Sequence, residues 1–474
     1  QLMPARRFSP GFWGDRFQTY RLLQEVNLRS LEADSSGTVL LQKTPQRPAR
    51  TWRDDWTQFT NQFKRAFLSK MRNRANLATT LLEAPALAFL VAVVLRYSED
   101  GAYNFASAFH IPTYLFLTLV IGLFLGLTNS AEEVIRDRTL LERERNHGIR
   151  VSFYILSKVL SLGFFALIQC VIYLLIADAI LSIRDMFWHN LFWMFTTSFV
   201  GIGVGLFISS LVNTPKTALN IIPLIMIPNI ILGGALIKYE EMNRGLDLIH
   251  SIRRFLGPNQ DSAAEKDSKL QVPAICQLMP LRWSYEAIII AHAERNPVSA
   301  LINDIESKLD SYKKLNEAGH ALSPKEEAGL DAAKDALAIV YGLDGRNADD
   351  VRGKIAEIRT GLTTGKFNPA EFMGDSAPGE TVTAEQLYLN EKVLDLFNRA
   401  EVERRDYRRG ADRPNVFFGK EKRWQFSSGD PENGKEPTAF HIPTLVLNAI
   451  VLLLFSLLGL VALHTSLKRQ MRKV

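Results

Sequence analysis

The stretch NSAEEVIRDRTLLERERNHGIRVSFYILSKVL, residues 129–160, places a dense run of charge directly before an apolar segment. Acidic and basic residues alternate through its first half, and its second half opens a long apolar block. Another apolar block, 112–128, ends just before it. A short charged helix between two blocks of nearly membrane-spanning length is typical of a connection between two transmembrane helices. A solvated turn is the ordinary alternative for such a charge run.

On both sides of this stretch the apolar residues gather in blocks, although the whole chain contains only 47% apolar and 22% charged residues. Each block has close to the roughly 20 residues that a helix needs to cross the hydrocarbon core. A polar stretch of soluble character separates the fifth block from the sixth. The fold class predicted is an all-α membrane protein with six transmembrane helices and a large, mostly helical extracytoplasmic insertion between helices five and six. The blocks are 77–95, 112–128, 153–177, 191–212, 218–237 and 442–464.

The basic residues of the short connections predict the orientation, because Lys and Arg near helix ends stay in the cytoplasm. One side holds 15 of them, whereas the two short loops on the other side hold only Arg96 and Arg184. We therefore expect a multi-pass protein of the cell inner membrane with both termini in the cytoplasm. The segment 238–438 then lies outside, and it carries 29 basic and 34 acidic residues. The basic pI of 9.1 thus reflects topology, and nucleic acid is not a predicted partner.

These boundaries divide the chain into five predicted parts. They are a cytoplasmic linker at 1–50, an amphipathic connecting helix at 51–75, transmembrane helices one to five at 76–237 with a cytoplasmic coupling helix at 131–150, an extracytoplasmic (periplasmic) helical domain at 238–438, and transmembrane helix six with a basic cytoplasmic tail at 439–474.

The connecting helix is predicted from an aromatic stripe at helical spacing. Such a stripe with basic neighbours, directly before a membrane span, favours a helix lying among lipid headgroups. Packing on another protein domain is the alternative. The stripe consists of Trp52, Trp56, Phe59, Phe63 and Phe67.

Helix-capping signals predict three helices in the outer segment, at 323–342, from Asn347 onward, and at 383–409. This segment shows no catalytic triad, metal cluster or glycine-rich loop. It is either a lid or docking surface for a periplasmic partner protein, or a lineage-specific decoration.

The hexapeptide AFHIPT occurs twice, at 108–113 and at 439–444. Four crossings separate the copies, so both are predicted on the outer surface. Each is predicted to start a helix, because Pro112 and Pro443 suit the first helical turn. His110 and His441 could share a metal or sense protons. The simpler interpretation is a pair of interfacial polar groups, since two His without Cys or carboxylate neighbours are a weak metal signal.

No ATP site is predicted in this chain, and no catalytic, cofactor-binding or metal-binding residues are assigned. GLTTGKF at 361–367 is one residue too short for a phosphate loop and lacks its Ser or Thr. GIGVG at 201–205 lies inside an apolar block, where Gly201 and Gly205 favour close helix packing. Cys170 lies in the third helix and Cys276 in the outer segment, so no intrachain disulfide is expected.

Four stretches resemble the permease of ABC exporters of the ABC-2 class, in particular the branch shared with the eukaryotic G subfamily. The main one is the run Asp137-Arg138, Leu140-Leu141, Arg143-Glu144-Arg145 and then SFYILSKVL. The others are FTNQFKRAFLSKMRNRANL at 59–77, IPNIILGGALI at 227–237 and MPLRWSYEAIIIA at 279–291. The resemblance covers 52–292 and 439–470 but not 295–437, and Asp137 stands where Glu is more usual.

The resemblance implies an ABC ATPase domain that docks on the charged run and carries ATP and Mg. It also implies a second permease protomer, related to the first by a two-fold axis in a homodimer. The ATPase would be a partner subunit or an upstream part of the same polypeptide, which the start at Gln1 favours. A stiff charged helix could transmit ATPase motion into the membrane helices. The residues assigned to coupling are Glu133, Arg136, Arg138, Glu142, Arg143, Glu144 and Arg145.

Polar residues within spans are costly unless they face a cavity or a neighbouring helix, so they are candidates for a translocation pathway. The candidates are Glu83, Gln169, Asn220, Asn229 and Asn448, and Asn229 is the first choice among them. The predicted pathway set is Gln169, Asn220 and Asn229. A hydrogen bond between helices is the alternative role for each.

Two functions remain open on the sequence. The first is the membrane permease of an ATP-driven exporter. The second is a non-transporting membrane anchor that transmits ATPase work or a signal to an extracytoplasmic partner. An ion channel is disfavoured because the spans contain no charged rings.

Overall fold

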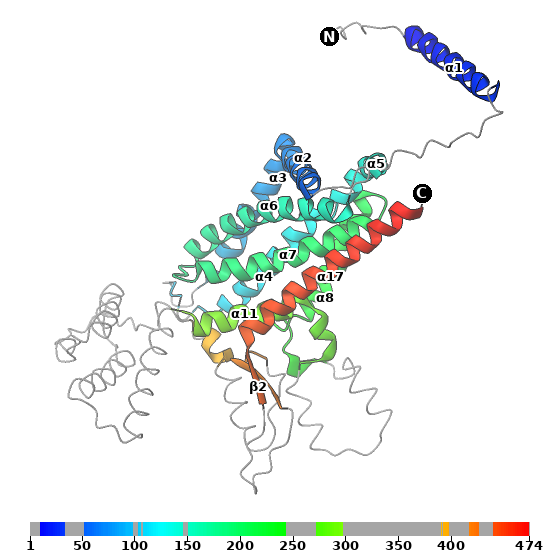
Figure 1. The fold of residues 1–474 in the computed structure, drawn as a ribbon. Helices are drawn as coiled ribbons and strands as arrows, with labels where there is room; N and C mark the ends of the chain where they lie inside the picture. The colour runs from blue at the N-terminus through cyan, green and yellow to red at the C-terminus, as the bar shows by residue number, and fades with distance from the viewer. Residues whose placement is uncertain are drawn as a thin grey trace, which may run out of the picture. The chain divides into compact units, whose positions relative to one another are not determined.

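The computed structural model is almost entirely helical in the part of the chain that it describes (Figure 1). That part comprises residues 10–33, 52–97, 103–105, 108–145, 150–242, 272–296, 390, 392–397, 417–425 and 439–473. The helices predicted at 323–342 and from Asn347 onward lie outside it, as does most of the helix predicted at 383–409.

Two helices precede the first span. α1 (Pro10–Ala33) has an exposed ion pair between Arg21 and Glu25 and lies within the segment that we predicted only as a linker. α2 (Trp52–Arg72) lies within the predicted connecting segment of 51–75. Its aromatic side chains stack along the helix, and the ring of Phe67 contacts Phe164 and Phe165 of α6.

Five of the described helices are long and apolar enough to cross a membrane, which confirms an all-α membrane protein. Their apolar residues cover the whole circumference, as expected for helices that contact both lipid and protein. They are α3 (Arg74–Leu95), α4 (Ile111–Ser130), α6 (Val151–Ile180), α7 (Phe187–Leu211) and α17 (Thr444–Lys473).

The fifth predicted span, 218–237, is shorter than expected. α8 (Pro215–Ile231) has 17 residues and ends six positions before the predicted limit of 237. The chain turns after it at Gly234, whose φ of +85° suits glycine. At 1.5 Å per residue α8 is about 25 Å long, less than the roughly 30 Å of a hydrocarbon core. The count of six full-length spans is therefore not confirmed.

α7 forms the centre of the bundle, packed between α4 on one side and α17 on another (Figure 1). Small residues allow this close approach. A Cβ atom on Gly126 of α4 would collide with the backbone of Ser198 on α7. Gly201 and Gly205 of α7 face α4 in the same way, which confirms their predicted packing role.

The outer segment returns to the bundle through α11 (Pro280–Glu294), which packs against α4, α7 and α17. Two short 3₁₀ helices, η1 (Tyr239–Glu241) and η3 (Ala274–Leu278), lie in the chain between α8 and α11. A short helical segment at 392–397 is attached to the loop before α4, because the amide of the nearby Asn390 donates to the carbonyls of Phe105 and Ala108.

The two AFHIPT copies differ in conformation. The first behaves as predicted, since α4 begins at Ile111 with Pro112 in its first turn. In the second copy, however, Ala439–Pro443 form the strand β2, and helix α17 begins only at Thr444. β2 pairs antiparallel with β1 (Glu421–Gln425), with His441 opposite Arg423. The prediction that Pro443 starts a helix is wrong, because here a partner strand supplies hydrogen bonds to an extended chain.

Candidate functional site

The charged stretch forms α5 (Glu133–Arg145), a helix of 13 residues within the predicted coupling segment of 131–150. It follows α4 after a short turn. Its first free backbone N–H groups, on Val134 and Ile135, donate to the hydroxyl Oγ of Ser209 on α7, at 3.0 and 3.2 Å. A residue of another helix thus caps α5, which binds its start to the end of α7.

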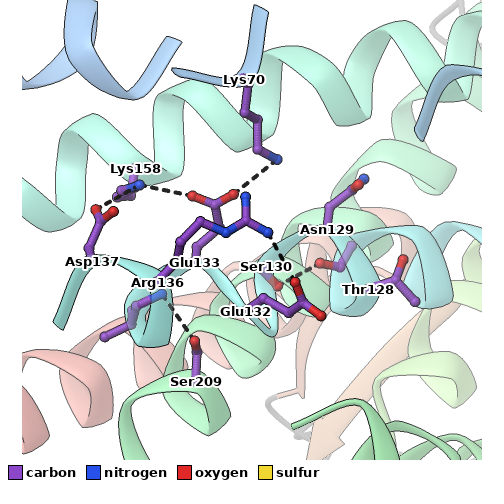
Figure 2. A network of polar contacts seen from close by, with 12 residues as sticks. Lys70, Thr128, Asn129, Ser130, Glu132, Glu133, Arg136, Asp137, Lys158 and Ser209 are labelled. Atoms are coloured by element: carbon purple, nitrogen blue, oxygen red, sulfur yellow. Dashed lines mark hydrogen bonds and ion pairs between the residues drawn. The ribbon is translucent and has the colours of Figure 1, made fainter. Parts of the chain in front are cut away.

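Glu133 and Asp137 lie on the inward face of α5 and share one cation. Lys158 of α6 places its Nζ 2.8 Å from Glu133 Oε2 and 2.8 Å from Asp137 Oδ2. Figure 2 shows Lys70 of α2 on the other side of the Glu133 carboxylate, 3.5 Å from Oε1. The Tyr154 hydroxyl also donates to Asp137 Oδ2. Two ammonium groups therefore balance two carboxylates, the condition under which charges can be buried together.

The two lysines are not equivalent partners. Burial lowers the pKa of Lys70 below its ordinary value, although the Glu133 carboxylate opposes this shift. Lys158 lies closer to Glu133 and contacts both carboxylates. The ion pair between α5 and α6 is therefore the principal one, and Lys70 adds α2 to the same cluster.

Arg138 fastens the other flank of α5. Its Nη1 donates to Asn213 Oδ1 at 2.7 Å and its Nη2 donates to the Val212 carbonyl at 3.0 Å. Both acceptors lie in the connection between α7 and α8. α5 thus contacts the beginning of α6, the end of α7 and the approach to α8.

The outward face of α5 carries Arg136, Thr139, Glu142 and Arg143, all exposed and spaced three or four residues apart. Among the described residues, Arg136 forms an ion pair with Glu132, which directly precedes α5, at 3.0 Å. Glu144 and Arg145 are in the last turn, and their side chains lie outside the described part. The predicted coupling residues therefore divide into two sets: Glu133 and Arg138 hold α5 in place, whereas Arg136, Glu142 and Arg143 remain accessible.

The predicted pathway residues do not come together. Gln169 is fully buried in α6, accepts from the Asn129 amide at 2.5 Å and donates to the Thr80 carbonyl at 2.7 Å. It joins α3, α4 and α6, so the helix-to-helix alternative describes it better than a pathway role does.

Asn220 and Asn229 lie on opposite faces of α8. Asn220 is exposed, on the same face as Leu224 and Ile227. Asn229 is buried and donates to the Ile225 carbonyl within its own helix at 2.9 Å. Asn220 is therefore the pathway candidate that this protomer leaves available.

The two histidines of the AFHIPT copies lie in different elements of the structure. His110 directly precedes α4, with its ring edge-on to Phe109. His441 lies in β2. Among the described residues, no group of three or more His, Cys, Asp or Glu side chains could hold a metal ion.

Sequence reasoning missed the partners that complete these networks. Lys158 lies inside the apolar block 153–177 and Asp178 directly follows it, and a single charge at such a place is a recognised sign of a polar cluster. Asp178 of α6 accepts from the hydroxyl of Tyr114 at 2.8 Å and from Asn190 at 3.3 Å, and Asn190 contacts His292 of α11 at 2.7 Å. This chain of buried groups links four helices near the opposite end of the bundle from α5.

Comparison with curated proteins gives no match. Comparison with protein-family models gives a match to the ABC-2 type transporter over residues 57–253. That range includes α5, its partners on α2, α6 and α7, and α8. Residues 57–253 of this chain thus form the membrane domain of an ABC-2 type transporter, a permease component with helices that span the membrane.

Proposed function

We propose that this chain is the permease of an ATP-driven exporter and that α5 passes motion from a cytoplasmic ATPase to the membrane helices. The observation that carries the proposal is the buried Glu133 carboxylate between Lys158 and Lys70. This contact joins α5 to α6 and α2. The Ser209 cap joins α5 to α7. A helix held on three sides by polar contacts moves with its neighbours, which is the property that a coupling element needs.

The exposed face of α5 is the proposed contact with the ATPase, which is either fused upstream or a separate subunit. Arg136, Glu142 and Arg143 offer two cations and one carboxylate on this face. Guanidinium groups bind carboxylates through two parallel hydrogen bonds, so they suit a polar protein interface. ATP and Mg would be bound by that ATPase. In this proposal both termini and α5 lie on the cytoplasmic side of the cell inner membrane.

The proposed pathway lies on the exposed face of α8 and is completed by a second protomer, as a homodimer. An exposed Asn220 on an apolar helix is unfavourable in lipid, which supports a neighbouring protein or a polar cavity at this face. Pro223 and Pro228 lack the N–H groups that would bond the preceding turn, so α8 also presents free carbonyl groups. Kinship with the G-subfamily branch remains a prediction from the sequence.

The test compares ATP turnover of the complete transporter in liposomes. Replacing Glu142 and Arg143 together by Ala should lower ATP turnover by about tenfold or more, because about 1.4 kcal/mol of lost coupling corresponds to that factor. Arg184→Ala is the matched control, since Arg184 is an exposed arginine in a loop predicted on the other side of the membrane. Equal ATP turnover in both variants and the natural protein would contradict the proposed contact.

A second function is favoured by one observation, the firm attachment of the outer segment to the bundle. The Lys422 ammonium, near the end of that segment, is buried against Glu286 of α11, and Glu286 also accepts from the Asn448 amide of α17. In a non-transporting anchor, this attachment would pass ATPase work to an extracytoplasmic partner. A structure of the dimer distinguishes the two functions, because a polar cavity along α8 fits a transporter and a sealed seam fits an anchor.

A further inference from the structure

Glu286 of α11 is a fully buried carboxylate far from α5 in the fold. Its Oε1 accepts from Lys422 Nζ at 2.5 Å and from the Phe418 backbone N–H at 3.2 Å. Its Oε2 accepts from the Asn448 amide at 3.1 Å and lies 3.4 Å from Arg282 Nη1. Each oxygen of this carboxylate therefore accepts from one neutral donor and lies beside one cation, and the Arg282 contact is an ion pair without a hydrogen bond.

The four groups around the Glu286 carboxylate come from three separate stretches of the chain. Arg282 belongs to α11 itself, Phe418 and Lys422 belong to the end of the outer segment and to β1, and Asn448 belongs to the second turn of α17. Burial alone would raise the pKa of Glu286, but Arg282 and Lys422 outweigh burial and hold its pKa below the ordinary value. The carboxylate is thus charged at neutral pH, and its partners are needed to compensate its burial.

A second set of contacts fixes the same place. The Thr444 hydroxyl donates to the Gly419 carbonyl at 2.5 Å, and the Thr444 backbone N–H donates to the Lys420 carbonyl at 3.0 Å. β2 ends at Pro443 and α17 begins at the next residue. No loop therefore separates the β1–β2 pair from the last membrane helix, as the orange strand and red helix of Figure 1 show.

We propose that Glu286 is the joint that fastens the outer segment to the membrane bundle, so that α11, the β1–β2 pair and the start of α17 move as one body. A displacement of the outer segment then reaches α17 directly. The inference extends beyond the proposed coupling to an ATPase, because it concerns the opposite end of the bundle and requires no nucleotide.

The experiment measures amide hydrogen exchange of the full chain in lipid nanodiscs. Glu286→Gln keeps the shape of the side chain but leaves Lys422 and Arg282 without a buried countercharge. Exchange should accelerate by about tenfold or more in three stretches at once, 280–288, 417–425 and 444–448, because local opening of one body exposes all of them. Lys420→Met is the matched control: it removes a half-exposed ion pair with Glu294 beside the same strand and should leave these rates nearly unchanged.

A double variant separates loss of the joint from general damage. Glu286→Gln combined with Lys422→Met removes both charges, and it should recover part of the protection lost in Glu286→Gln alone. If Glu286→Gln does not yield folded protein, Lys422→Met alone provides the test, since Glu286 keeps Arg282 and Asn448. It should then accelerate exchange in β1 and at the start of α17. Acceleration confined to the substituted stretch, or none in any variant, would overturn the proposal.

Discussion

α5 and α8 are both short helices that follow a long membrane helix, yet they are held in opposite ways. α5 inserts two carboxylates among two lysines and is fixed to α2, α6 and α7. α8 buries a narrow apolar stripe that includes Ile222 and Met226 and leaves its opposite face exposed. Polar contacts in a buried site are directional, whereas apolar contacts allow sliding. The comparison supports the proposal that α5 transmits motion and that α8 undergoes it.

The caps of the two helices show the same contrast. α5 is capped by Ser209, which lies on α7 and 75 positions away from Val134. α8 is capped by its own Thr214, whose hydroxyl accepts from the Thr217 backbone N–H at 3.2 Å. α5 therefore loses its cap if it separates from α7, whereas α8 carries its cap with it.

The largest effect is expected from Lys158→Met, which leaves the buried Glu133 with the more distant Lys70 and leaves the partly buried Asp137 with the Tyr154 hydroxyl. The loss in free energy of unfolding should be about 3–5 kcal/mol, as for other buried ion pairs broken on one side. Thermal unfolding in detergent measures it. Arg136→Met is the control, because its pair with Glu132 is exposed and should contribute less than about 1 kcal/mol. Similar melting temperatures for the two variants would remove the distinction between inward and outward charges of α5.

The next effect is expected from Ser209→Ala, which removes the acceptor for two buried N–H groups. It should cost about 1–2 kcal/mol and accelerate hydrogen exchange in the first turn of α5. Ser198→Ala is the matched control on the same helix, because the Ser198 hydroxyl is buried without a hydrogen-bond partner and its loss should be nearly neutral. Unchanged exchange in α5 would show that the cap from α7 is unimportant.

A smaller effect is expected from Thr214→Ala at the start of α8. Its cap is exposed to solvent, so the cost should be about 0.5–1 kcal/mol and the increase in exchange should stay within the first turn of α8. A loss as large as that of Ser209→Ala, or one that reaches α7, would mean that α8 is fixed as firmly as α5.

The smallest effect on stability is expected from Asn220→Leu. The Asn220 amide is exposed, and it makes no hydrogen bond among the described residues that the substitution would remove. The free energy of unfolding should change by less than about 0.5 kcal/mol, which the melting temperature in detergent measures. Gln169→Leu breaks two buried hydrogen bonds and should cost clearly more. If Asn220→Leu is the more damaging of the two in the isolated protomer, the accessible face of α8 is wrongly identified.

Local patterns predicted the long helices and the aromatic stripe of α2 well, since apolar length and helical spacing are properties of contiguous residues. The same patterns predicted α5 but not its polar contacts with neighbouring helices. Lys158 lies 25 positions from its partner Glu133, and Ser209 lies 75 positions from its partner Val134. The single lysine in SFYILSKVL was the available signal. Its partner could not be chosen from the sequence, since several carboxylates lie within reach on the charged run.

The AFHIPT copies show where local reasoning fails. One hexapeptide starts a helix at 111, and the other is a strand up to 443, because only the second lies beside another extended segment. Proline tolerates both the first turn of a helix and an edge strand, so its position does not decide between them.

α17 has a consequence that reaches across the whole bundle. It runs for 30 residues, about 45 Å, without an internal proline. Its first residue is bound to the chain before β1, and near its other end Ser466 and Gln470 bond Ser210, the neighbour of the Ser209 cap. A single helix thus connects the β1–β2 pair with the contact that anchors α5, so an axial shift of one end would displace the other end without passing through a loop.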